Sequence, residues 1–171
     1  MTLDVVARHE ILLPVRPAFI VFTLVCAVLL NMLLGWASWM RPDFVALVVL
    51  YWCIQQPRLV GFTAGFSLGL LMDVAEGTLL GQHALAYSIL AFAGIALHRR
   101  VRMFSLTAQI VHVIPLLLAN DLIVLGIRLL GGADSPGYRY FVGSIFAGLL
   151  WPVVSVLLKL PQRPRADPDH V

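Results

Sequence analysis

Charged residues are scarce in this chain of 171 residues. Only 12% are Asp, Glu, Lys or Arg, whereas 60% are hydrophobic and the mean hydropathy is +0.91. A soluble domain needs a polar exterior, and so few charges are not enough to cover one of this length. The composition therefore excludes a soluble fold and predicts an all-α polytopic membrane protein. Six crossings would use about 120 residues, which leaves no room for a second folded domain.

Paired cysteines and catalytic motifs are also missing. Cys26 and Cys53 both lie in apolar segments without a paired spacing, which is typical of reduced filler residues. The sequence has no P-loop, no HExxH, no GxSxG and no Cys/His cluster with metal-ligand spacing. The net charge of +3 does not indicate nucleic-acid binding. We therefore expect no enzyme activity, no metal and no cofactor.

Six apolar segments follow one another along the chain. They cover residues 18–40, 43–55, 59–74, 82–97, 105–130 and 138–160. The second is doubtful as a crossing, because its apolar part, residues 44–54, is short enough for a re-entrant piece. We expect residues 1–17 to form a cytoplasmic N-terminal head and 18–160 the transmembrane domain. The Pro-rich, charged residues 161–171 are predicted to be a disordered cytoplasmic tail.

The placement of basic residues decides whether the second segment crosses. With six crossings and the N-terminus inside, nine of the 12 basic residues lie on the cytoplasmic side. If the second segment fails to cross, only four do. Because cytoplasmic loops carry an excess of Lys and Arg, we expect six transmembrane helices with both termini in the cytoplasm. The basic loop with Arg99, Arg100 and Arg102 then serves to fix topology or contacts anionic lipid.

A stripe of glycines marks the third segment. Gly61, Gly65 and Gly69 recur every four residues, and Asp73 and Gly77 continue the spacing. Four residues advance about 400° on a helix, so these positions share one face. In a membrane, such a stripe lets another helix approach closely. Two interpretations stay open: the glycines pack this helix inside its own bundle, or they seat a transmembrane helix of a partner.

Asp73 stands near the end of the same segment, where its charge opposes the helix macrodipole. Something should therefore compensate the carboxylate. The candidates are Arg41, Arg139 or capping of the next backbone turn. The alternative is that Asp73 contacts a partner or a ligand.

Asn120 and Asp121 form a polar pair in the middle of the fifth segment. An ionisable group at that depth is costly and should face the bundle interior or a wet cavity. Arg128 lies seven residues further on, nearly on the same face, and arginine side chains lean toward the helix N-terminus. The pattern indicates either an internal Asp121–Arg128 pair or a functional interior site. His83 and His98 lie at the ends of the fourth segment, and we assign them no chemistry.

One stretch carries the pattern of a known family. Its residues are Pro42, Tyr51, Trp52, Pro57, Gly61, Gly65, Phe66, Gly69, Asp73, Gly77, Leu80, Gly81, Ala84 and Leu85. They match the shape P…YW…P…G…GFxxGxxxD…LGxxAL. Together with the length and layout of the chain, this pattern resembles the rod shape-determining protein MreD family. Beyond Arg102 the sequence carries little of the pattern.

The resemblance implies a non-enzymatic scaffold of the cell-elongation (rod) complex in the bacterial inner membrane, which maintains cell shape. Its partners would be MreC, which has one transmembrane helix, and indirectly MreB, RodA and a class B penicillin-binding transpeptidase. The basic loop would then be a candidate contact for MreB.

The resemblance also implies a six-helix arrangement similar to the S components of energy-coupling-factor transporters. This supplies an alternative function, a substrate-binding membrane subunit for a vitamin-type solute, with a cavity around Asp73, Asn120 and Asp121. A third option, an intramembrane enzyme, would need a second acid or histidine facing Asp121.

Overall fold

The computed structural model describes residues 15–34, 42–133 and 137–162. These residues form six α-helices and two short 3-10 helices, without a strand among them. The elements are α1 (Pro17–Leu34), α2 (Phe44–Gln55), α3 (Phe62–Glu76), α4 (Gln82–Arg102), α5 (Leu106–Leu130), η1 (Tyr138–Phe141), α6 (Val142–Lys159) and η2 (Leu160–Gln162). Each predicted apolar segment thus contains one α-helix, and the all-α prediction is confirmed. Most of the predicted head and tail, residues 1–14 and 163–171, lies outside the described residues.

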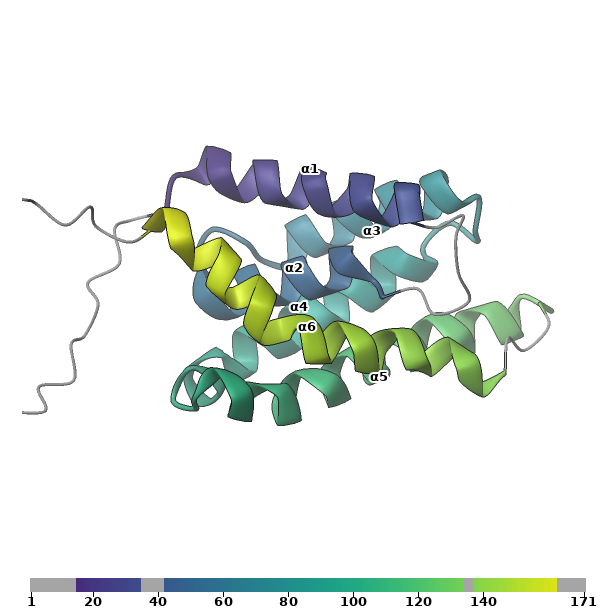
Figure 1. Ribbon diagram of the computed structural model, residues 1–171. Coiled ribbons are helices and arrows are strands. Elements are labelled where there is room, and N and C mark those ends of the chain that lie inside the picture. The colour runs from purple at the N-terminus through teal and green to yellow at the C-terminus, as the bar shows by residue number, and fades with distance from the viewer. Residues whose placement is uncertain (1–14, 35–41, 134–136, 163–171) are drawn as a thin grey trace, which may run out of the picture.

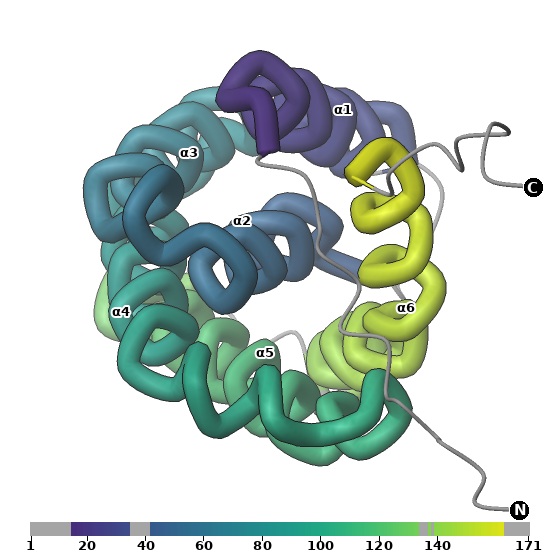
Figure 2. Tube along the Cα trace, turned by 90° about the vertical axis from the view of Figure 1, so that its left-hand side faces the viewer, coloured from purple at the N-terminus to yellow at the C-terminus, as the bar shows by residue number. Residues whose placement is uncertain are grey.

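Successive helices run in opposite directions along one bundle axis (Figure 1). Seen along that axis, the other five helices surround α2 (Figure 2). All ten residues from Val45 to Ile54 are buried, with at most 8% of any residue exposed. A helix that is hydrophobic on every side is stable only where it is buried on every side, which accounts for the central position of α2.

The lengths of the helices differ. α1, α4, α5 and the segment Arg139–Gln162 around α6 are each long and apolar enough to cross a membrane. α2 has 12 residues and α3 has 15, about 18 and 22 Å of helix, against a hydrocarbon core of about 30 Å. Because the other five helices surround α2, this helix does not have to span the hydrocarbon core by its own length.

α1 packs on α2 along a single stripe. The buried residues of this stripe are Ile20, Thr23, Leu24, Ala27, Val28 and Asn31. Trp52 of α2 donates its indole N–H to the Thr23 hydroxyl at 2.9 Å, in the middle of the contact. The opposite face of α1 exposes large side chains such as Phe22 and Leu33, at 62% and 75%. α1 therefore closes the bundle with one face and presents an apolar face outward.

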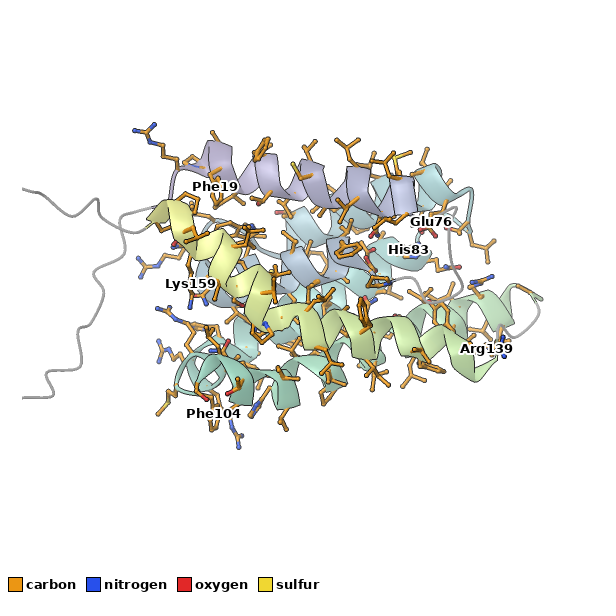
Figure 3. All side chains as sticks on the ribbon, in the orientation of Figure 1. Phe19, Glu76, His83, Phe104, Arg139 and Lys159 are labelled. Atoms are coloured by element: carbon orange, nitrogen blue, oxygen red, sulfur yellow. The ribbon has the colours of Figure 1, made fainter. Side chains whose placement is uncertain are left out.

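Charged residues separate toward the two ends of the bundle. Glu76 lies at one end and Lys159 at the other (Figure 3). The end with Glu76 also holds Asp43, just before α2, and Asp73, near the end of α3. The opposite end holds most of the described basic residues, next to or in the last turns of α1, α2, α4 and α6: Arg16, Arg58, Arg99, Arg100, Arg102 and Lys159. Arg139 is an exception and lies at the end with Glu76 (Figure 3). We refer to the two ends as the acidic end and the basic end.

Candidate functional site

α3 and α4 approach backbone to backbone at two glycines. A β-carbon on Gly65 would lie 2.7 Å from the Tyr87 carbonyl oxygen, and one on Gly69 would lie 2.3 Å from Ala84 Cα. Gly61 is looser, since its nearest neighbour would be the Ile95 side chain at 4.0 Å. Gly65 and Gly69 thus pack α3 inside its own bundle. α4 fills the face that was one possible seat for a partner's helix.

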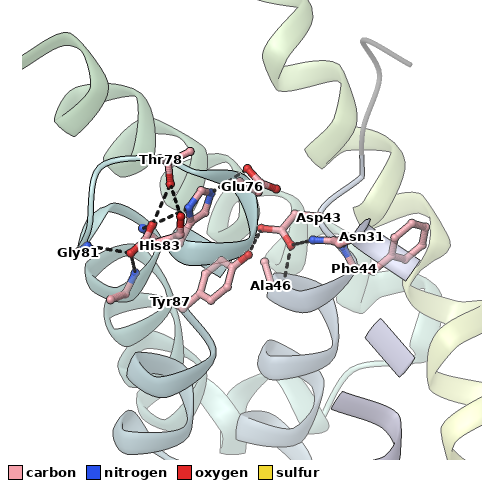
Figure 4. Close-up of polar contacts among 11 residues, drawn as sticks. Asn31, Asp43, Phe44, Ala46, Glu76, Thr78, Gly81, His83 and Tyr87 are labelled. Atoms are coloured by element: carbon pink, nitrogen blue, oxygen red, sulfur yellow. Dashed lines mark hydrogen bonds and ion pairs between the residues drawn. The ribbon is translucent and has the colours of Figure 1, made fainter. Parts of the chain in front are cut away.

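Asp73 caps the N-terminus of α4. Gly81, the N-cap residue of α4, has no side chain that could do so. The Asp73 carboxylate accepts the backbone N–H groups of Gly81 and His83 at 2.8 Å each and of Ala84 at 3.3 Å (Figure 4). The first N–H groups of a helix lack partners within the helix and favour a negative charge.

Capping of the next turn is therefore the compensation that Asp73 receives. The structure places no arginine of the described residues within ion-pair distance of this carboxylate, and Arg41 lies outside them. The turn that brings α4 back toward Asp73 needs Gly77, whose φ of +63° is a left-handed conformation. Asp73 itself is 1% exposed, which makes it part of the α3–α4 hairpin and leaves little of it for a partner to contact.

His83 belongs to this arrangement, although we assigned it no chemistry from its position in the sequence. Its Nδ1 lies 2.9 Å from Asp73 Oδ1, and its Nε2 lies 4.0 Å from Glu76 Oε2. The ring also packs edge-on against Tyr87, one turn further along α4, with the ring centroids 5.7 Å apart. Asp73 and His83 form a carboxylate–imidazole pair. Both carboxylate oxygens already accept backbone N–H groups, so the pair serves helix capping first.

Asp43 caps a second helix, α2, and also contacts side chains of two other helices. It is the N-cap of α2 and accepts the Ala46 N–H at 3.0 Å. It also accepts the Asn31 amide of α1 at 3.0 Å and the Tyr87 hydroxyl of α4 at 2.7 Å. Asn31 in turn accepts the Phe44 N–H at 2.9 Å. One carboxylate thus joins three helices, a role that sequence spacing did not reveal.

Asp121 lies deeper in the bundle, between α5 and α6. The Ser144 hydroxyl of α6 donates to its carboxylate. The predicted pair with Arg128 is wrong, because the two side chains form no ion pair. Asp121 and Arg128 lie on nearly the same face of α5, but they are about 10 Å apart along the helix axis, which is a long distance for an arginine side chain to span. Arg128 lies instead within electrostatic range of Tyr140.

The remaining predicted residues lie apart from these groups. Arg99, Arg100 and Arg102 are exposed in the last turn of α4, where positive charge is favourable for a helix. Within the described ranges, no three His, Cys, Asp or Glu residues gather as a metal site would require. The predicted site residues thus fall into three separate groups: the α3–α4 contact, the buried Asp121 cluster and the basic end. Arg128, in the last turn of α5, belongs to none of them.

Comparison with known proteins gives two matches. The family model described as rod shape-determining protein MreD matches residues 9–160. The rod shape-determining protein MreD of Haemophilus influenzae is 27% identical over 148 residues, which cover 83% of this chain and 91% of that protein. No solved structure matches the chain.

Proposed function

This chain belongs to the rod shape-determining protein MreD family, and on that premise we propose that it is a non-enzymatic membrane scaffold of the cell-elongation complex. Membership gives it a role in rod shape determination. In the proposal, the bundle binds the single transmembrane helix of MreC. It thereby links peptidoglycan synthesis by RodA and a class B penicillin-binding transpeptidase to cytoplasmic MreB.

The proposed setting is the bacterial inner membrane, with six crossings and both termini in the cytoplasm. Three features support it. Four segments are long and apolar enough to cross, successive helices alternate in direction, and most of the described basic residues lie at one end. Excess positive charge marks the cytoplasmic side, so the basic end would face the cytoplasm and the acidic end the periplasm. α2 and α3 would be the other two crossings. Both are short, and α2 lies inside the bundle while α3 packs against the longer α4.

One observation carries the scaffold proposal: the polar chemistry of the acidic end serves to hold the bundle together. The carboxylates of Asp43 and Asp73 cap α2 and α4 with hydrogen bonds to backbone N–H groups. The outward faces, in contrast, present large apolar side chains over the length of the helices. A bundle whose buried carboxylates are already bonded to its own backbone, and whose exterior is apolar, is suited to binding other helices within the membrane.

The test is co-purification of the full chain with MreC from detergent. Because α4 covers Gly65 and Gly69, MreC must bind an outward face. One exposed residue on each outward face is therefore changed to Trp: Phe22 on α1, Ser67 on α3, Phe92 on α4, Val111 on α5 and Val153 on α6. We expect one variant to reduce the amount of recovered MreC at least tenfold, while the other four recover as much as the wild type. Equal recovery with all five variants, or no MreC with the wild-type chain, contradicts the proposal.

The basic end is the proposed cytoplasmic contact for MreB or anionic lipid. Arg99, Arg100 and Arg102 are exposed there. Replacing all three by Gln should weaken MreB association and leave MreC recovery unchanged. A cytosolic reporter fused to the C-terminus must stay active, which separates loss of contact from inverted topology.

A vitamin-type transporter subunit is the second candidate function. The observation in its favour is Gln82, which is 1% exposed and whose amide nitrogen and oxygen both lack a hydrogen-bond partner. This function requires that a vitamin-sized solute stabilise the purified protein and that a coupling ATPase co-purify with it. Failure of both measurements excludes it.

A further inference from the structure

The outward face of α4 is apolar along most of its length and ends in arginines. Leu85, Ile89 and Phe92 are 49%, 43% and 68% exposed and recur at intervals of four and three residues. Residues at such intervals share one face of a helix, and Arg99 and Arg100 continue it seven and eight residues after Phe92. With the basic end in the cytoplasm, as proposed, acyl chains cover the apolar residues. The two arginines then lie where this lipid-facing side of α4 reaches the cytoplasmic surface.

Arg102 completes a positively charged last turn that faces outward. Arg99, Arg100 and Arg102 are all exposed, whereas Val101 between them is 0% exposed and faces the bundle. The acidic side chains of the described residues lie at the acidic end or, for Asp121, where α5 contacts α6. Within the described ranges, no carboxylate thus lies at the basic end to balance these charges. The last turn of α4 therefore offers three positive charges to an anion from outside the bundle.

The depth of this turn in the membrane suits a lipid phosphate. α4 has 21 residues, about 32 Å of helix, which is close to the hydrocarbon thickness of about 30 Å. Only residues 103–105 separate α4 from α5, so no long loop carries the arginines away into the cytoplasm. Met103, the next residue, is 85% exposed, and an apolar side chain at this depth can enter the edge of the lipid layer. The turn thus combines cations and an exposed apolar side chain at the level of the headgroups.

We propose that the last turn of α4 binds anionic phospholipid, with Arg99, Arg100 and Arg102 on the headgroup phosphate and an acyl chain along the outward face of the helix. A guanidinium group can form two parallel hydrogen bonds to a phosphate, and clusters of Arg next to a membrane helix attract anionic lipids. Cytoplasmic MreB would approach from the water and could not cover the face that carries Phe92. The inference rests on the orientation in the proposed function and chooses between the two partners named there for the basic end.

The experiment measures the thermal unfolding midpoint of the full chain in mixed micelles of detergent and lipid. Phosphatidylglycerol is titrated, with phosphatidylcholine as the neutral comparison and inorganic phosphate as the anion without acyl chains. We expect a saturable rise of the midpoint with phosphatidylglycerol only, since a ligand that binds the native state stabilises it. With Arg99, Arg100 and Arg102 all replaced by Gln, half-saturation should need at least tenfold more lipid. Replacement by Lys should give an intermediate value, because Lys keeps the charge but loses the paired hydrogen bonds.

Arg16→Gln is the matched control. Arg16 is an exposed arginine of the basic end, but it precedes α1, and α3 lies between α1 and α4 in the ring around α2 (Figure 2). This variant should respond to phosphatidylglycerol as the wild type does. The proposal is overturned if the two lipids give the same midpoints, if inorganic phosphate gives the same rise, or if Arg16→Gln weakens the response as much as the triple Gln variant. Should the triple variant not fold, Arg99→Gln and Arg100→Gln, each compared with Arg16→Gln, decide by the same criteria.

MreB binding to reconstituted vesicles separates the two partners of the basic end. The weaker MreB association expected of the triple Gln variant should appear only in vesicles that contain phosphatidylglycerol. If MreB binds the wild type but not this variant in phosphatidylcholine alone, the arginines contact MreB directly, which overturns the proposal. The lipid titration in micelles needs neither MreC nor a fixed orientation. Its outcome is therefore distinct from MreC recovery, which tests the scaffold role.

Discussion

Gly69 of α3 lies against the backbone of Ala84 in α4 with no space between them for a side chain. A β-carbon on Gly69 would be 2.3 Å from Ala84 Cα and 2.5 Å from Ala84 N. One turn further, Asp73 accepts the N–H groups at the start of the same α4. The four-residue spacing of Gly65, Gly69 and Asp73 therefore has one cause: α3 lies along the first half of α4 and caps it.

Gly69→Ala is expected to destabilise the protein. The added methyl group meets backbone atoms of α4, which move only if the two helices separate, and overpacking of this kind costs about 1–3 kcal/mol. The apparent unfolding midpoint in detergent should fall. Gly126→Ala in α5 is the matched control, because a β-carbon there meets no atom within 4 Å. Its midpoint should stay unchanged or rise, since Ala is favoured over Gly inside a helix by roughly 1 kcal/mol. Equal midpoints for the two variants would show that α3 and α4 are not in close contact.

Asp73→Ala should cost more stability than Asp73→Asn. Ala leaves the N–H groups of Gly81, His83 and Ala84 without an acceptor, and losing a cap typically costs about 1 kcal/mol and up to about 2. Asn keeps one oxygen but loses the charge that favours a helix N-terminus, about 0.3–1 kcal/mol. Thermal unfolding in detergent gives the order, and cell width in a strain that carries each variant gives the consequence. Glu76→Gln is the comparison, because it removes the charge of a neighbouring carboxylate, 4.0 Å from His83 Nε2, and leaves the Asp73 cap in place. If Asp73→Ala unfolds at the wild-type temperature, the cap is unimportant.

The helices and the separation of charge could be predicted because they depend on local patterns. Apolar runs of sufficient length mark α1, α4, α5 and α6, and the short run 44–54 marks α2. The spacing of Gly65, Gly69 and Asp73 places them on one face of α3. What the pattern left open was the neighbour that this face meets, because a glycine stripe fits a helix of the same chain as well as a helix of another.

The contacts of Asp43 and His83 could not be predicted, because they join residues that are distant in the sequence. Asp43 and Tyr87 are 44 residues apart and meet only after α2 is inserted between its neighbours. The sequence places Asp43 at the end of an apolar run and His83 after a turn, and both positions are common for solvated residues. The predicted Asp121–Arg128 pair failed for the opposite reason: spacing on one helix fixes the face but ignores the Ser144 hydroxyl of the facing α6.

Tyr87→Phe tests whether the Asp43 cap depends on α4. The substitution removes a hydroxyl that donates to the Asp43 carboxylate at 2.7 Å. A hydrogen bond to a charged group contributes about 1.5–3 kcal/mol, so the unfolding midpoint should fall. Tyr51→Phe is the matched control. Tyr51 is as fully buried as Tyr87, but its hydroxyl lacks a partner, and the nearby Gln162 amide donates to the Leu158 carbonyl instead. Its removal should be neutral or slightly stabilising. If Tyr87→Phe lowered the unfolding midpoint less than Tyr51→Phe, the hydrogen bond from Tyr87 to Asp43 would not stabilise the bundle.

The orientation of the bundle in the membrane can be measured with reporter proteins fused into two turns that lie at opposite ends. The turn between α3 and α4, residues 77–81, lies at the acidic end, and the turn between α4 and α5, residues 103–105, lies at the basic end. A six-crossing chain with a cytoplasmic N-terminus places the first turn in the periplasm and the second in the cytoplasm. Alkaline phosphatase, which needs an oxidising compartment, should be active when fused after Thr78 and inactive after Met103. A fluorescent protein that matures only in the cytosol should give the reverse pattern. Fluorescence after Thr78 would mean that α2 and α3 do not both cross, and the basic end would then face the periplasm.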